Sequence, residues 1–463
     1  MRTAILLLLI PGLAPGVSGQ TVPRTDLPRS GALRLTFDPL IETWGEQFFG
    51  GRRERLGAPL TGDTVGGARI PVVARLETDV RTASGVAGFV ASLGTGRLAA
   101  RQERRTTPIT AEVGITDRLA VGLTLPLVRV YTRAHLALDT AGASVGLNPL
   151  LLSPDNAASY GRFFLEFGGA LGQLADSIAG GSYGCPGSPA CAQATAFLAE
   201  AQGVRDALGR LVYGAGTGGG APFLPHAQSD GGLGIDANLA RIQQELATTY
   251  NIAAFSSDLL LPTEPLDRAA FETALTDTVY GFGLRPFGGT PVRRRYWLGD
   301  VEVGARYRVA AGPVYAATAG VRLRLPTGHP DSPHDALDVA TGDGQMDIEG
   351  QLVQELVLGG RLWLNLNARA GLQRPGERVR RVAPPDAFLV PRAATARLRW
   401  DPGDYVALDF APLFRFSRWF AAGFTAGYVT RGEDRHTFAT PQDSSALAAR
   451  LSAPTAAGVL DQG

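Results

Sequence analysis

Charged side chains recur at alternate positions along several segments in the last third of this 463-residue chain. In the segment 300–310 the charged residues occupy one parity and the apolar residues occupy the other. Successive side chains of a β-strand point to opposite faces, so such a segment predicts a strand with one charged face and one apolar face. The charged residues expected to share that face are Asp300, Glu302, Arg306, Arg308, Arg322, Arg324, Asp347, Glu349, Glu355 and Arg369.

Two kinds of chemistry are open to these residues. Opposite charges on neighbouring strands can pair, each pair contributing about 0.2–1 kcal/mol, and a ladder of pairs would stiffen the sheet. Charged side chains that line a water-filled passage instead tune which ions enter it. The sequence leaves both interpretations open.

The sequence offers little for catalysis or for a metal site. No histidine lies centrally in a clear strand or beside a nucleophile motif, as a hydrolase would require. The loop 326–345 gathers acidic residues among glycines, but their spacing is not that of a calcium-binding loop. We therefore predict a protein that is not an enzyme and has no metal and no cofactor. The histidines are His135, His226, His329, His334 and His436.

The ends of the chain carry further signals. Arg2, an apolar run over 4–10 and small residues before Gln20 predict a signal peptide over residues 1–19. No later stretch approaches the roughly 18 apolar residues of a membrane-spanning helix.

The net charge of +1 argues against a nucleic-acid partner. Cys185 and Cys191 flank a short loop. An exported protein enters an oxidising compartment, so we expect these cysteines to form a disulfide.

The elements that would position the charged residues are predicted hairpins. Alternation covers the ranges 109–127, 298–325, 346–372 and 405–430, with short turns inside each hairpin and long polar loops over 326–345 and 373–403. Short turns on one side and long loops on the other are typical of outer-membrane barrels. Four tryptophans near predicted strand ends suit the aromatic girdles of such barrels: Trp297, Trp363, Trp400 and Trp419.

The predicted fold is therefore all-β, a transmembrane antiparallel β-barrel of about twelve to sixteen strands with a large helix-containing insertion. Residues 20–138 hold the N-terminal segment and the first strands, where 68–80 and 89–104 are possible strands. Residues 139–296 form the insertion, with helices over 157–178, 192–211 and 236–250, as an extracellular cap or a plug. Residues 297–430 are barrel strands. Residues 431–463 are a loop without alternation, which we interpret as a truncated end or as closing strands not recognised.

Several motifs resemble a known family. They are Gly114-Ile115-Thr116-Asp117-Arg118-Leu119, Leu298-Gly299-Asp300-Val301-Glu302, Leu325-Pro326-Thr327-Gly328 and Thr341-Gly342-Asp343-Gly344-Gln345 with Asp347. Together they resemble outer-membrane barrels assigned as transporters of the phenol-degradation meta-cleavage pathway, within the broad group of long-chain fatty-acid channels. The resemblance covers 107–130 and 297–430, about a third of the chain. It implies passage of small hydrophobic compounds and brings no binding residues to this sequence.

The expected function is passive uptake of small, hydrophobic compounds across the outer membrane of a diderm bacterium. The alternatives are a structural or surface-interaction barrel without transport and, less favoured, an outer-membrane hydrolase. The expected partners are outer-membrane lipid, small hydrophobic solutes and the barrel-assembly machinery.

Overall fold

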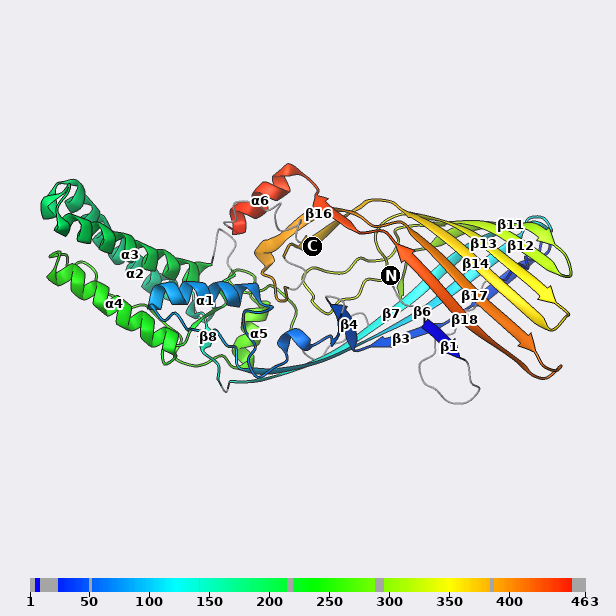
Figure 1. Ribbon diagram of the computed structural model, residues 1–463, viewed down its shortest axis with the longest axis horizontal. Coiled ribbons are helices and arrows are strands. Elements are labelled where there is room, and N and C mark those ends of the chain that lie inside the picture. The colour runs from blue at the N-terminus through cyan, green and yellow to red at the C-terminus, as the bar shows by residue number, and fades with distance from the viewer. Residues whose placement is uncertain are drawn as a thin grey trace.

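The computed structural model describes residues 5–8, 24–49, 52–140, 142–214, 220–287, 295–383 and 387–451. The molecule is elongated, with a curved sheet at one end and a group of helices at the other (Figure 1). The long strands β6 (Thr95–Gly114) and β7 (Leu119–Asp139) pair along their whole length and join the two ends. At about 3.3 Å per residue this β6–β7 ribbon spans roughly 65 Å.

The main sheet has twelve antiparallel strands. The predicted hairpins are confirmed, and their short turns gather at the end of the sheet that lies away from the helices (Figure 1). No pairing joins β2 to β18 or β1 among the described residues, so the sheet is open there and the predicted closure is not established. In order, the strands are β1 (Ile5–Leu8), β18 (Ala421–Arg431), β17 (Tyr405–Arg415), β14 (Leu362–Gln373), β13 (Asp347–Leu358), β12 (Tyr315–Arg324), β11 (Glu302–Ala311), β7, β6 and β2 (Leu33–Phe37), with β10 (Trp297–Leu298) on β7 and β3 (Leu40–Trp44) on β6.

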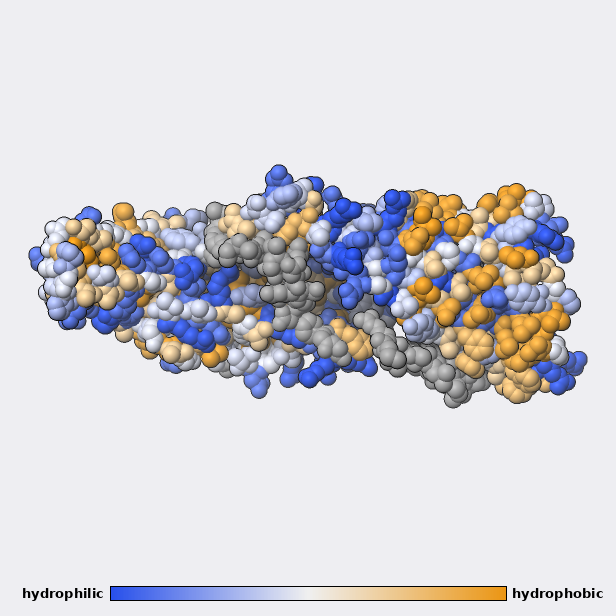
Figure 2. Space-filling view, turned by 45° about the horizontal axis from the view of Figure 1, so that its top comes forward, coloured by the Kyte–Doolittle hydropathy of each residue, from blue (hydrophilic) through white to orange (hydrophobic). Residues whose placement is uncertain are grey.

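The two faces of the sheet differ in polarity, and the apolar face is the exposed one. We call the apolar side the outer face and the charged side the inner face. Val321 is 54% exposed and Leu372 is 59% exposed on the outer face, whereas Glu349 is 6% exposed and Asn367 is 1% exposed on the inner face. The hydrophobic residues of this sheet therefore do not form a core. Figure 2 shows them as orange patches over the strand end of the molecule.

The helices build the ordinary hydrophobic core that the sheet lacks. Phe163, Phe167 and Leu171 follow one another at helical spacing and are fully or almost fully buried. The helices of the insertion, predicted from this spacing, are confirmed, and they lie beyond the end of the sheet rather than inside it (Figure 1). No helix in the described ranges has the length and hydropathy to cross a membrane. The helices are α1 (Pro71–Ser84), α2 (Asn156–Ala179), α3 (Pro189–Tyr213), α4 (Asp230–Thr248) and α5 (Arg268–Thr276).

Several predictions for single elements are wrong. The segment 68–80 was expected as a strand, but from Pro71 onward it is helix α1, which buries Val73 and Val80. The polar loop 373–403 contains β15 (Gly376–Arg381) and β16 (Thr395–Asp401), which pair with each other and, through β16, with β19 (Arg435–Phe438). Trp400 on β16 is 5% exposed beneath the Arg378 guanidinium, so it is not a girdle residue.

The remaining elements are short. Two small sheets outside the main sheet pair β4 (Glu46–Phe49) with β5 (Arg52–Arg55) as a hairpin, and β8 (Val145–Leu147) with the distant β9 (Phe223–Pro225). Helix α6 (Pro441–Leu451) lies in the range predicted as a loop, and residues 452–463 fall outside the described residues. Within the predicted signal peptide the structure describes β1, which pairs with β18, and the signal peptide stays a prediction.

Candidate functional site: the charged inner face

The inner face carries a ladder of ion pairs across β11, β12 and β13. The strand register places Glu302 opposite Arg324, and Arg324 opposite Asp347. The Arg324 guanidinium lies 3.2 Å from the Glu302 carboxylate and 3.3 Å from that of Asp347. Arg322 reaches the same Glu302 at 3.2 Å. Pairing of opposite charges offsets part of the cost of taking the carboxylates out of water, and the arginines keep a third or more of their side-chain surface exposed.

The ladder continues on β13, β14 and β17. Glu349 lies 3.7 Å from Arg322 and 4.0 Å from Arg369, and it accepts a hydrogen bond from the Tyr405 hydroxyl. Arg369 also pairs with Asp409 at 3.1 Å. Sequence reasoning missed Tyr405 and Asp409, because they share the inner face of β17 with Ala407 and Ala411, and no run of charges marks that face.

The other flank of the inner face is organised by Glu112 on β6, which is 8% exposed. Arg306 of β11 contacts Glu112 at 3.2 Å, and Arg34 of β2 contacts it at 3.3 Å. Arg34 also pairs with Asp26 at 2.8 Å. The paired charges therefore run from β2 across the sheet to β17.

A segment near the N-terminus, residues 24–28, lies on this face. The Thr318 hydroxyl donates to the Thr25 carbonyl at 2.7 Å, and the Thr25 hydroxyl donates to Glu355 at 3.4 Å. Arg306 donates to the Arg24 carbonyl. Thr25 is 6% exposed and Thr318 is 1% exposed, so the segment covers the sheet rather than resting loosely on it. No alternation in residues 20–32 signals this placement.

A cavity of about 690 Å³ remains between this segment and the ladder. Its lining carries both signs of charge, with Glu112 and Glu302 facing four arginines. A volume of this size accommodates a small solute. The charged lining residues are Arg24, Arg34, Asp38, Glu112, Glu302, Arg306 and Arg322.

Three of the predicted residues are not in the ladder: Glu355 accepts the hydrogen bond from Thr25, and Asp300 and Arg308 lie apart from it. Asp300 is 8% exposed and accepts hydrogen bonds from the backbone N–H groups of Gly328 at 2.9 Å and Asp343 at 2.8 Å. It thus holds the two ends of the loop 326–345 together, and a Cβ at Gly342 would lie 2.2 Å from its carboxylate. Arg308 makes no ion pair with any described residue and lies beside the turn at Arg118. The glycine motifs behind the family resemblance are therefore structural here.

The histidines do not assemble with acidic groups into a recognisable active site. His334 accepts a hydrogen bond from Arg381 at 3.3 Å, and the His329 ring packs against Trp297. Arg381 also donates to the carbonyls of Phe282 and Pro333, both at 2.6 Å, and so joins the helical end to the loop 326–345. Burial and the positive charges of Arg381 and Arg392 lower the pKa of His334 below its usual value. No group of candidate metal ligands occurs among the described residues.

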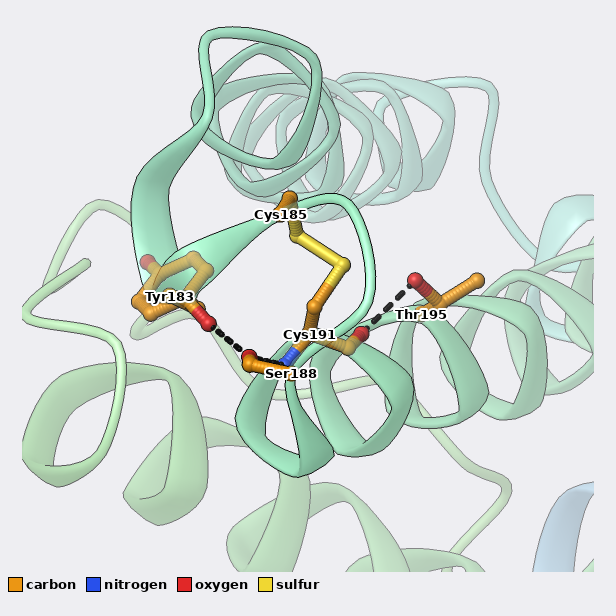
Figure 3. The surroundings of a disulfide bond; sticks show 5 residues. All are labelled: Tyr183, Cys185, Ser188, Cys191 and Thr195. Atoms are coloured by element: carbon orange, nitrogen blue, oxygen red, sulfur yellow. Dashed lines mark hydrogen bonds between the residues drawn. A yellow bond between two sulfur atoms is a disulfide. The ribbon is translucent and has the colours of Figure 1, made fainter.

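The predicted disulfide is present. Cys185, in the loop after α2, is joined to Cys191 in the first turn of α3, and the Ser188 hydroxyl caps α3 by accepting from the Cys191 N–H at 3.0 Å (Figure 3). This loop lies at the end of the molecule farthest from the sheet (Figure 1). The disulfide therefore closes the outer tip of the helical end and has no part in the inner face.

Comparison with known proteins adds a structural likeness. No family model matches the chain, and no curated protein matches it. Among solved structures, an outer membrane channel from Pseudomonas putida F1 is similar over 92% of this chain and 79% of that one, with 8% sequence identity and a TM-score of 0.32.

Proposed function

We propose that this chain is an outer-membrane β-barrel channel that admits small solutes through the charged interior of its sheet. The observation that carries the proposal is the inverted polarity of the sheet, with exposed apolar side chains outside and paired charges inside. A sheet in water buries its apolar face, whereas a barrel wall in lipid exposes it. Outer-face strands of ten to twelve residues, as in β11 to β14, match the bilayer span of about 9–11 tilted residues.

The orientation follows from the connections. Short turns of outer-membrane barrels face the periplasm and long loops face outward. On this basis the turns at 115–118 and 359–361 are periplasmic, and the helices stand outside the cell as a cap. Closure of the barrel belongs to the same proposal, because an open edge in lipid would leave unpaired backbone groups, each costing several kcal/mol.

The nature of the solute is a further part of the proposal. The cavity on the inner face is lined by charged and uncharged polar side chains together with some apolar ones, which favours polar or amphipathic solutes. Hydrophobic compounds, which the family resemblance implies, would pass more readily along an apolar route. A structural barrel without transport is the second candidate, and the extent of ion pairing favours it because a fully paired ladder would fill the interior.

The test uses the full-length protein in planar bilayers. Reversing Arg322 and Arg324 to Glu removes two positive charges from the ladder and adds two negative ones, so we expect the anion-to-cation preference to shift towards cations. The matched control is Arg205→Glu on α3, an exposed residue paired with Asp206, which should leave the preference unchanged. Liposome swelling with a sugar and with a phenol of similar size identifies the solute class.

Two outcomes of these measurements would contradict the proposed channel. An unchanged ion preference in the double variant would remove these arginines from the conducting path. A protein that inserts but neither conducts nor admits either solute would support the structural barrel.

A further inference from the structure

The outer face of the β6–β7 ribbon changes character at one level. On β7 the outward side chains from Leu119 to Leu127 are apolar over about nine residues, the length that crosses a bilayer. The next outward side chains are Arg129, Tyr131 and Arg133. The arginines therefore begin where the apolar surface ends, on the side of the helices.

The arginines face one another across the two strands. Arg105 is opposite Arg129, and Arg101 is opposite Arg133. Like charges placed directly opposite in a sheet repel, so each of these pairs is unfavourable unless an anion lies between them. Glu103 lies between the two pairs and contacts Arg105. Arg101 and Arg129 make no ion pair with any described residue.

The inward side of the ribbon cannot supply the missing anion. Val130 is fully buried and Thr132 is 6% exposed, with the Thr132 hydroxyl bonded to the Leu337 carbonyl. Arg133 points outward, where its guanidinium lies 4.9 Å from the Tyr131 ring centre and donates to the Tyr131 hydroxyl at 2.8 Å. Arg101, Arg129 and Arg133 thus carry positive charge on the outer face without an ion pair to a described carboxylate.

A cavity of about 1080 Å³ adjoins this arginine cluster. Arg97 and Arg101 line it from β6, and Arg55 lines it from β5. None of these three pairs with a described carboxylate, whereas Arg53 in the same cavity pairs with Glu46. Trp44 and Phe48 complete the wall with apolar surface. The cavity therefore combines free guanidinium groups with aromatic side chains.

We propose that the cluster Arg97, Arg101, Arg105, Arg129 and Arg133 binds the phosphate groups of lipid headgroups in the outer leaflet. Guanidinium groups bind phosphate oxygens in a bidentate manner, and one phosphate between two facing arginines would offset their repulsion. The position fits a lipid rather than a free anion, because the apolar outer face directly below would contact the acyl chains. The inference rests on the proposed membrane-embedded barrel.

The test is native mass spectrometry of the detergent-purified full-length protein with added lipid A. The probes are lipid A carrying both phosphates and the same lipid after dephosphorylation. Removing two charges in Arg101→Gln/Arg133→Gln should weaken binding of the phosphorylated lipid about 30-fold, the combined effect of two membrane-surface arginines. The matched control, Arg118→Gln/Arg361→Gln, removes two exposed charges from the turns at the other end of the sheet and should bind as the unchanged protein does.

The outcomes separate this inference from the proposed function. Equal binding of the phosphorylated and dephosphorylated lipids, or equal loss in both double variants, would overturn it. Inorganic phosphate that binds the cluster without displacing lipid A would also overturn it, since the occupant would then be a free anion. Insertion of the protein into vesicles of neutral phosphatidylcholine is measured in parallel: failure to insert contradicts the barrel itself, and insertion without phosphate preference contradicts only the lipid site.

Discussion

At the scale of single residues, parity in the sequence identifies which charges share the inner face but not their partners. Arg322, Arg324 and Glu349 were predicted from alternation, and the structure places them in ion pairs. Glu112 and Asp409 were not predicted as members of this face. Their ion pairs with Arg306 and Arg369 depend on strand order and register. Neither is written in the local sequence.

The best residue for a pH experiment is His334. Its pKa is lowered, so the folded protein holds the ring neutral while the unfolded chain takes up a proton near the usual value of about 6.5. In that window the unfolded state binds more protons, so stability falls as the pH drops below about 6.5 and the full contribution is present above it. We expect thermal unfolding of the wild-type protein to shift down between pH 7.5 and 5, and His334→Gln to reduce that shift.

The control for this experiment is His135→Gln, because His135 is exposed on β7. A slope with pH that is the same in His334→Gln and in the wild type would show that this ring does not titrate on unfolding. His436 on β19 also has a lowered pKa, mainly through burial, so part of the slope should persist in the variant.

At the scale of elements, period-two and helical patterns were enough for the main hairpins and for the longest helices. The predicted hairpins and the helices α2, α3 and α4 rest on such patterns. Helix α1 was missed because the β-branched valines at its start are typical of a strand. In the structure, tertiary packing that buries Val73 and Val80 accompanies the helix. Strand β15 was missed because it has one apolar residue, Val379, among charged ones. Strand β16 does alternate, with Ala396, Leu398 and Trp400 buried, but it is only seven residues long and the pattern was overlooked.

The element with the clearest test is the segment 24–28 on the inner face. Deleting it removes the contacts of Thr25 with Thr318 and Glu355 and opens the cavity of about 690 Å³. We expect higher single-channel conductance with little change in the folded sheet, measured in planar bilayers and by circular dichroism. The control is Thr25→Ser, which keeps the hydroxyl and the backbone carbonyl. Unchanged conductance on deletion would mean that the segment does not narrow the path.

At the scale of the whole molecule, the helical end buries its apolar residues and the sheet exposes them. The helical end follows the rule for water, with Phe163 and Phe167 inside. The sheet follows the rule for lipid, with Val321 and Leu372 outside. The sequence reveals this difference, because apolar residues alternate in the sheet and follow helical spacing in the helices. It does not show how far apart the two parts lie, because that distance depends on where the pairing of β6 with β7 ends.

The distance between the parts gives a test of orientation. The disulfide of Cys185 and Cys191 lies at the tip farthest from the sheet (Figure 1). If the helices face outward, a reductant that cannot cross the outer membrane should open this bond on intact cells, and a thiol-reactive mass tag should then shift the protein on a gel. Labelling only after the outer membrane is permeabilised would place the helices in the periplasm instead.

The continuity of the β6–β7 ladder has a mechanical meaning. Its pairing runs unbroken from Thr95 and Asp139 beside the helices to Gly114 and Ala120 at the far turn. A load applied to the helical end would therefore pass along these two strands into the wall. The softest point of the ribbon would be where Pro108 lies opposite Pro126, because neither proline can donate a backbone hydrogen bond. Strand β6 carries Glu112, so the ion pair between Glu112 and Arg306 would be among the first contacts in the wall to be strained.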